Sequence, residues 1–190
     1  MNKIEIVIIF VIVVILLFYI QKKYLEVEYV ISDIDNNRYL VRNRDDKQKA
    51  ANMLAKLNKN IKKLLNHMKK LDPDNEDIKR LVDNYSVENI SEGTEDSNYT
   101  SYSVNKGEKI VFCLRQRDGT DDFVDENVLM YVATHELGHL MTKEIGHTET
   151  FWNNFRYLLS EAIKIKVYKK TDFSENPTEY CGINIKSSII

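Results

Sequence analysis

Hydrophobic and polar residues are distributed unevenly along this chain, and the strongest apolar run lies near its start. Residues 4–20 contain sixteen apolar side chains in seventeen positions, with Glu5 as the exception. At about 1.5 Å per residue, a helix of this length spans roughly 25 Å, slightly less than the roughly 30 Å hydrocarbon core of a bilayer. The run therefore predicts one transmembrane helix, which forms an anchor over residues 1–23.

Two other interpretations of the apolar run are open, a cleaved signal peptide and a buried strand. A signal peptide has a shorter apolar core and a small-residue cleavage site, whereas Ile20 leads directly into QKKYLEVEYV. A core strand of this length would be far longer than usual. Tyr19 and Tyr24 fit interfacial positions, and Lys22 and Lys23 fit the headgroup region. We therefore expect a single-pass membrane protein, although the cations flanking the helix do not decide its orientation.

The remaining residues, 28–190, show short strand-like and longer helix-like patterns. Alternating residues on both sides of Asp35 predict a β-hairpin over residues 28–42. Apolar residues at spacings of three and four predict a helix over residues 47–71, which Pro73 ends. The other expected elements are a short helix at 75–85, a surface loop at 86–97, and two strands at 99–104 and 109–115.

The helix predicted at residues 47–71 contains eight lysines and no acidic residue. One interpretation is a basic face for a nucleic acid or an anionic membrane. The other is a core helix with a solvated lysine face, which the regular apolar stripe favours. The whole chain of 190 residues has 27 Lys and Arg against 29 Asp and Glu. This balance excludes a globally basic nucleic-acid binder, so a nucleic-acid partner is possible but not favoured.

Three of the four histidines lie within thirteen residues, HELGHLMTKEIGH at 135–147. His135 and His139 are one helical turn apart and share a face, so their ring nitrogens can bind one Zn²⁺ at about 2.0–2.1 Å. Glu136 is displaced around the helix and fits a general base rather than a ligand. Asp125 is the expected N-cap of this helix.

Two residues compete as the third zinc ligand. Gly146 can adopt a positive φ, end the helix and turn His147 back toward the metal. Seven residues separate His139 from His147, compared with five in the metzincin pattern. Glu161, on a following helix capped by Thr148, is the alternative. The sequence favours His147.

Three further positions have two interpretations each. Gly138 lies inside the helix, where it costs about 1 kcal/mol relative to Ala; it either allows a strand or substrate to approach or is simply tolerated. Cys113 lies in an apolar strand, which favours a buried free thiol over a pairing with Cys181 in an oxidising compartment. Tyr180 either stabilises an oxyanion or belongs to the core or surface.

The stretch VATHELGHLMTKEIGHTETFW at residues 132–152 resembles the minimal zincins of the WLM and SprT-like group. These proteins share H-E-x-x-H, a short turn, a third His and a following aromatic, which Phe151 and Trp152 match. KGEKIVFCLR at 106–115 is similar to the strand before the active-site helix. NPTEYCG at 176–182 is similar to forms from large DNA viruses. The resemblance covers roughly residues 99–181, and the N-terminal anchor departs from it.

The resemblance implies an α+β zincin-like domain at residues 28–190, with a small antiparallel or mixed sheet and an active-site helix. It implies a zinc metallopeptidase that hydrolyses protein or peptide substrates. The apolar run separately predicts that residues 4–20 hold the chain in a membrane, which is a host or virion membrane if the protein is viral. We expect an extended peptide to pair with the strand at 109–115. The alternatives are a structural membrane protein whose zinc site has no turnover, which Glu136 argues against, and a nucleic-acid-associated protease.

Overall fold

Five α-helices and seven strands lie within residues 2–95, 97 and 99–190, which the computed structural model describes, the side chains of residues 22–25 excepted. The helices are α1 (Lys3–Leu25), α2 (Lys47–Leu71), α3 (Glu76–Asn84), α4 (Glu126–Met141) and α5 (Glu149–Lys164), with one 3₁₀ turn at Val87–Asn89. The strands are β1 (Val27–Ile31), β2 (Arg38–Arg42), β3 (Ile90–Glu92), β4 (Tyr102–Val104), β5 (Lys109–Phe112), β6 (Thr178–Tyr180) and β7 (Ile183–Ile185).

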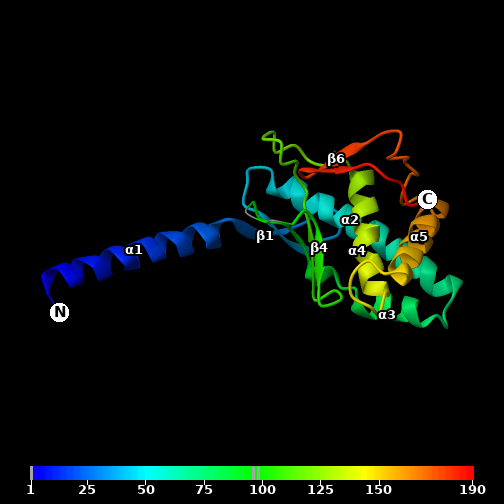
Figure 1. The fold of residues 1–190 in the computed structure, drawn as a ribbon, viewed down its shortest axis with the longest axis horizontal. Coiled ribbons are helices and arrows are strands. Elements are labelled where there is room, and N and C mark those ends of the chain that lie inside the picture. Colours follow the sequence, from blue (N-terminus) through cyan, green and yellow to red (C-terminus); the bar gives the residue numbers. More distant parts are fainter. Residues whose placement is uncertain (1, 96, 98) are drawn as a thin grey trace.

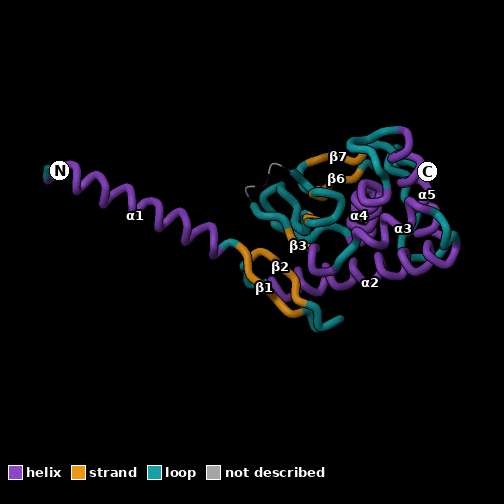
Figure 2. Tube along the Cα trace, turned by 90° about the horizontal axis from the view of Figure 1, so that it is seen from below, coloured by secondary structure: helices purple, strands orange, loops and turns teal. Residues whose placement is uncertain are grey.

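Helix α1 extends away from the rest of the protein (Figures 1 and 2) and is long and apolar enough over Lys3–Gln21 to cross a membrane. Glu5, its polar exception, accepts a hydrogen bond from the Asn2 backbone, while the Asn2 side chain accepts one from the Glu5 backbone, both at 2.8 Å. This capping box starts the helix. The side chains of residues 22–25, to which interfacial positions were assigned, lie outside those that the structure describes.

The main sheet is mixed, in the strand order β1-β2-β3-β5-β4. The outer pairs, β1 with β2 and β4 with β5, are antiparallel, whereas β3 pairs in parallel with both β2 and β5. The expected α+β class is therefore confirmed. The prediction that a peptide would pair with the strand at 109–115 is wrong, because β5 already has a hydrogen-bonded neighbour on each side. The edge strand on that side is β4.

The surface loop predicted at residues 86–97 is also wrong, because strand β3 lies there and is buried in the centre of the sheet. Its residue Glu92 is only 3% exposed. The Glu92 carboxylate accepts hydrogen bonds from the Arg42 backbone at 2.7 Å and from Arg115 Nε at 2.8 Å. Burial nonetheless raises the pKa of Glu92. In the sequence alone, an acidic residue that is buried and paired in the fold looks the same as an acidic residue of an exposed surface loop.

The helices form the second layer. Helix α2 buries its apolar stripe and leaves most of its lysines exposed, and α4 packs against α5, α3 and α2. The hairpin and the helices expected at 47–71 and 75–85 are confirmed. Asp46 is the residue before α2, but its side chain makes no capping bond there. It instead pairs with Arg115 Nη1 at 2.6 Å, and so ties the start of α2 to the chain after β5.

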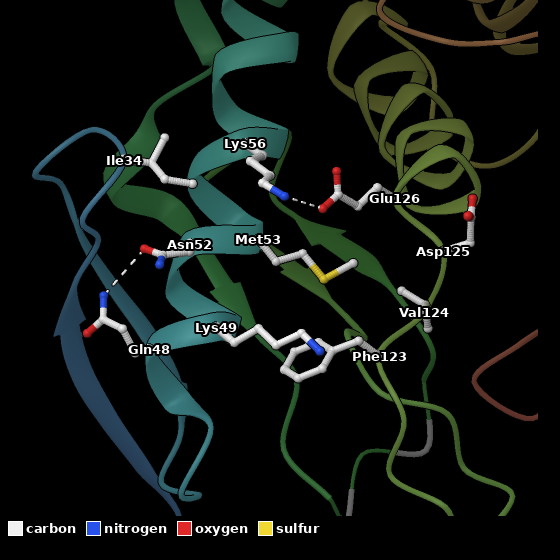
Figure 3. Close-up of a pocket in the computed structure, with 10 residues that line it drawn as sticks. All are labelled: Ile34, Gln48, Lys49, Asn52, Met53, Lys56, Phe123, Val124, Asp125 and Glu126. Carbon is white, nitrogen blue, oxygen red and sulfur yellow. Dashed lines mark hydrogen bonds and ion pairs between the residues drawn. The ribbon is translucent and has the colours of Figure 1, made fainter.

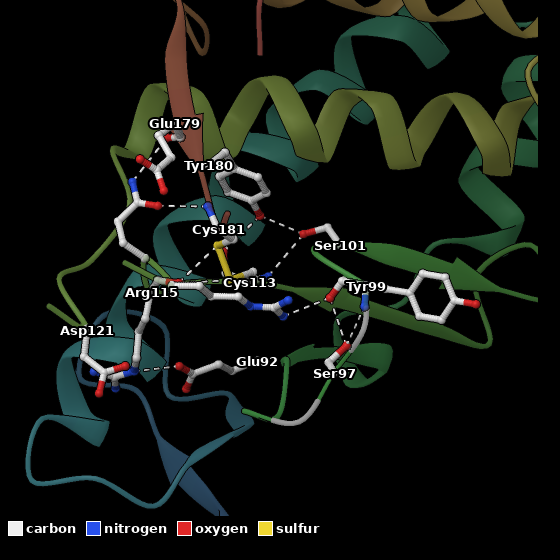
Figure 4. The surroundings of a disulfide bond; sticks show 12 residues. Glu92, Ser97, Tyr99, Ser101, Cys113, Arg115, Asp121, Glu179, Tyr180 and Cys181 are labelled. Carbon is white, nitrogen blue, oxygen red and sulfur yellow. Dashed lines mark hydrogen bonds and ion pairs between the residues drawn. A yellow bond between two sulfur atoms is a disulfide. The ribbon is translucent and has the colours of Figure 1, made fainter. Parts of the chain in front are cut away.

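A disulfide joins Cys113, after β5, to Cys181, in the turn between β6 and β7 (Figure 4). The prediction of a free buried thiol is therefore wrong. Both cysteines are buried, at 6% and 2% exposure, because the β6–β7 hairpin covers this end of the sheet. Tyr180 beside the bond is fully buried and donates to the Cys113 carbonyl at 2.9 Å, with its hydroxyl 2.7 Å from Ser101 Oγ. Tyr180 is therefore a core residue.

Candidate active site

Helix α4 presents two of the four histidines. Its N-cap is Asp125, as predicted, whose carboxylate accepts from the backbone of Asn127 at 2.8 Å and of Val128 at 3.0 Å. Most of the helix is buried, and His135 and His139 lie half-buried on its more open face.

The loop between α4 and α5 brings the third histidine back to the first two. Helix α4 ends at Met141, five residues before Gly146, so the expectation that Gly146 ends the helix is wrong. Gly146 has φ +87° and turns the chain immediately before His147. Thr148 then caps α5, as predicted, by accepting from the Phe151 backbone at 3.3 Å.

The side chains of His135, His139 and His147 converge. Their nearest ligand atoms all lie within 4.8 Å of one another, and the Nε2 atoms of His135 and His147 are 3.0 Å apart. Two nitrogens bound tetrahedrally to one Zn²⁺ at about 2.05 Å would lie about 3.3 Å apart, so the donor set fits a small divalent cation. Within the described part of the chain, this is the only group of three potential ligands.

The competing ligand, Glu161, lies outside this group. Its carboxylate pairs with His67 Nε2 at 2.8 Å and with Lys164 Nζ at 2.6 Å. Burial raises the pKa of Glu161, but hydrogen bonds from Lys164 and His67 outweigh it, and the net shift is downward. The structure thus brings His147, not Glu161, to the two helical histidines. The fourth histidine of the chain, His67, lies elsewhere, within hydrogen-bond distance of Glu161.

Two aromatic rings of α5 support the histidines. Phe151 stacks on His139, with ring centroids 4.3 Å apart, and Trp152 stacks on His147 at 5.4 Å. Gly138 makes room for the first ring, since an added Cβ would lie 3.0 Å from Phe151 Cε2. The close approach that this glycine allows therefore comes from α5, and not from a strand or a substrate.

Burial and mutual repulsion keep the helical histidines neutral. Burial, followed by the charges of the neighbouring histidines, lowers the pKa of His135 to about 3. Burial, followed by His147 and Lys106, lowers the pKa of His139 to about 4. Because metal binding requires an unprotonated imidazole, these two rings are in the ligating form at neutral pH.

Glu136 is buried at 5% exposure and lines the same pocket as the histidines. Burial raises the pKa of its carboxyl to about 7, and interaction with the side chain and backbone of Ser103 opposes the rise. A general base is most effective when its pKa lies near the working pH. Glu136 therefore lines the pocket with a carboxyl group whose pKa lies near neutral.

The pocket, of about 540 Å³, lies between α4, the His147 loop and edge strand β4. Besides the histidines and Glu136 it is lined by Ser101, Tyr102, Ser103, Asn105, Lys106, Ile145 and Gly146. Sequence reasoning missed the wall that β4 contributes. The strand itself was predicted, but no pattern in it shows that it forms an edge beside Glu136.

A larger hollow, of about 680 Å³, lies away from the histidines between α2 and the start of α4 (Figure 3). Its main charged groups already have partners. Lys56 pairs with Glu126 at 2.6 Å, and Lys49 lies 4.5 Å from the centre of the Phe123 ring. It contains no histidine or cysteine, so the smaller pocket is the candidate site.

Comparison with known proteins identifies the family. The family model of the WLM domain matches residues 33–188. The chain belongs to the WLM family. The match begins well before residue 99, so β2 and α2 are part of the WLM domain, which the motif resemblance alone had not included.

Relatives of this WLM protein occur in large DNA viruses. An uncharacterized protein of Acanthamoeba polyphaga mimivirus is 36% identical over 190 residues, covering 94% of this chain and 92% of the relative. An uncharacterized protein of Invertebrate iridescent virus 6 is 33% identical over 72 residues, covering 37% of this chain and 40% of the relative. The first match spans nearly the whole chain.

Among solved structures, the WLM domain is similar to Wss1 from Saccharomyces cerevisiae, with a TM-score of 0.51 at 20% identity. The likeness covers 67% of this chain and 88% of that one. It supports the zincin-like α+β fold, while the family as a whole is metallopeptidase-like.

Proposed function

We propose that this chain is a membrane-anchored zinc metallopeptidase that hydrolyses peptide bonds. The observation that carries the proposal is the convergence of three histidine ligands beside the buried carboxylate of Glu136 in one open pocket. His135, His139 and His147 would hold the metal, and Glu136 would act as the base. Membership of the WLM family supports the same reaction class.

A bound Zn²⁺ supplies Lewis acidity, which polarises a carbonyl and lowers the pKa of water from 15.7 to about 7. Glu136 would accept a proton from the attacking water on its carboxylate. It would then donate that proton to the leaving amine as the peptide C–N bond breaks. Its raised pKa favours both directions of this transfer at neutral pH.

Edge strand β4 would hold the substrate. On its inner side β4 pairs with β5 through Tyr102, Ser103 and Val104. Its outer side is the sheet edge, and Tyr102 and Ser103 line the pocket. An extended peptide that adds to this edge as a further strand would pass alongside Glu136 and the histidines.

The alternative function is a zinc site without turnover. Glu136 argues against it, because a purely structural metal site needs no buried base, and structural sites are closed by a fourth ligand. The three-histidine set leaves one position open. Helix α1 would anchor the protein through residues 4–20 in a bilayer, consistent with its exposed apolar surface.

The test combines metal content with hydrolysis. The purified full-length chain in a non-ionic detergent should contain one zinc per chain and cleave a mixed peptide library, and a chelator should abolish cleavage. His135→Ala and His139→Ala should lose stoichiometric zinc. The matched control is His67→Ala, which removes the histidine that lies with Glu161 and should retain zinc. Full zinc in both site variants would overturn the assignment.

A further inference from the structure

We propose that Lys106 is a positioning residue for the metal site, because its ammonium group fixes the loop that carries His147. The inference rests on the proposed function, since it concerns the same site. Lys106 is not one of the three candidate metal ligands. It lies in the β4–β5 turn and lines the pocket.

Lys106 binds the C-terminal end of α4. The last carbonyl groups of a helix have no partner within it. Lys106 Nζ donates to the carbonyl oxygen of His139 at 3.0 Å and to that of Thr142 at 2.6 Å. Lys106 therefore holds the backbone of one ligand residue and that of Thr142, the residue that follows α4.

The Lys106 ammonium group also contacts the loop that follows α4. Lys106 Nζ also donates to the Glu144 carbonyl at 2.6 Å. Residues 143–146 are exposed, and Ile145 is 92% exposed. Within the portion of the chain that the structure describes, no other hydrogen bond reaches residues 143–146. One ammonium group thus links the ligands on α4 to the loop that delivers the third.

The turn that carries Lys106 is itself held in place by contacts with neighbouring segments. Asn89 Nδ2 donates to the Gly107 carbonyl at 2.8 Å. Gly107 has φ +113°, and an added Cβ would collide with the Asn84 carbonyl oxygen. The turn is therefore packed directly against the end of α3, and it offers the Lys106 side chain a fixed base.

A simpler role for Lys106 would be to stabilise the negative end of the α4 dipole. Arg80 offers a direct comparison, because its Nη1 donates to the Met141 carbonyl at 2.6 Å. Both cations therefore cap the same helix end, but only Lys106 contacts the loop beyond it. A dipole effect would make the two residues equivalent for metal binding, whereas loop positioning would not.

Outer contacts that orient metal ligands typically change metal affinity by 10–100-fold when removed. We expect Lys106→Met to weaken Zn²⁺ binding by at least about tenfold within that range. Arg80→Met should lower thermal stability but change Zn²⁺ affinity by less than about threefold. The shorter Lys106→Gln retains hydrogen-bond donors and should lie between Met and wild type, and it replaces Lys106→Met if that variant does not fold.

The experiment measures the Zn²⁺ dissociation constant of each full-length variant in detergent, by competition with a chelating indicator. Fluorescence of Trp152, which stacks on His147, provides a second readout at the third ligand. Equal affinity in wild type and both Lys106 variants, or equal weakening by Arg80→Met, would overturn the inference and leave the proposed function intact. A wild-type chain that binds no Zn²⁺ would overturn both.

Discussion

Removal of the disulfide between Cys113 and Cys181 should strongly destabilise the domain, because the bond closes a long segment of chain. The two cysteines are 68 residues apart, and the segment between them contains α4, α5 and all three candidate ligands. In the chain-entropy treatment, a loop of this length lowers the entropy of the unfolded chain by about 15 cal/mol/K, or about 4.4 kcal/mol at 25 °C.

The assay is guanidinium unfolding of the full-length chain in a non-ionic detergent, followed by fluorescence of Trp152, the only tryptophan. Three samples are compared: oxidised wild type, wild type with reductant, and a Cys113→Ala/Cys181→Ala variant. Reductant should lower the free energy of unfolding of the wild type by about 4 kcal/mol. The double variant should be at least as unstable and should not respond to reductant, which controls for effects of the reductant itself.

The prediction fails if the oxidised chain, denatured without reductant, shows two reactive thiols. It also fails if reductant changes the free energy of unfolding by less than about 1 kcal/mol, because loop closure should exceed that value. Since disulfides persist mainly in oxidising compartments, an intact bond in protein taken from its native membrane would place the domain on the oxidising side. The sequence alone left that orientation open.

Three further predictions concern stability and anchoring. Gly107→Ala should lower the free energy of unfolding by about 3 kcal/mol, at the upper end of overpacking costs. Gly119 also has a positive φ, +90°, but nothing lies near an added Cβ there, so Gly119→Ala should lower the free energy of unfolding by about 1 kcal/mol. Similar losses in the two variants would refute the collision between an added Cβ at Gly107 and the Asn84 carbonyl. A hydrogen bond from Arg115 lowers the pKa of Asp46 in the folded chain. The ionised Asp46 carboxylate therefore stabilises the fold at pH values above the pKa that Asp46 has in the unfolded chain. That contribution is lost as the pH falls through the pKa of Asp46 in the folded chain. The difference in melting temperature between wild type and Asp46→Asn should therefore shrink below about pH 4. Deletion of residues 1–23 should release the protein from carbonate-washed membranes, whereas a soluble full-length chain would exclude the anchor.

The sequence predicted those parts of the fold whose signal is local. The helix at 47–71 follows from apolar spacing alone, and the caps at Asp125 and Thr148 follow from side chains within one turn. The three-histidine cluster was predicted from the spacing of His135 and His139 and from a glycine before His147. In each case the residues that decide the structure are close neighbours in the chain.

The features that were missed depend on contacts between distant segments. Strand β3 is three residues long, and its buried Glu92 is paired with Arg115 and with the Arg42 backbone, both distant from it in the chain. The disulfide depends on the β6–β7 hairpin reaching the end of β5. The edge position of β4 and the three carbonyls around Lys106 follow from the order of strands in the sheet, which no local pattern encodes.

The central claim, that Glu136 is the base of a zinc peptidase, is tested most directly by Glu136→Gln. Zinc content and peptide hydrolysis are measured on the same preparations of wild type and variant, each as the full-length chain in detergent. Glutamine keeps the size of the side chain but cannot accept the proton. The account predicts one zinc per chain in both proteins and a loss of turnover of about 10²–10⁴-fold in the variant. Retained turnover, or loss of zinc from the variant, would contradict it.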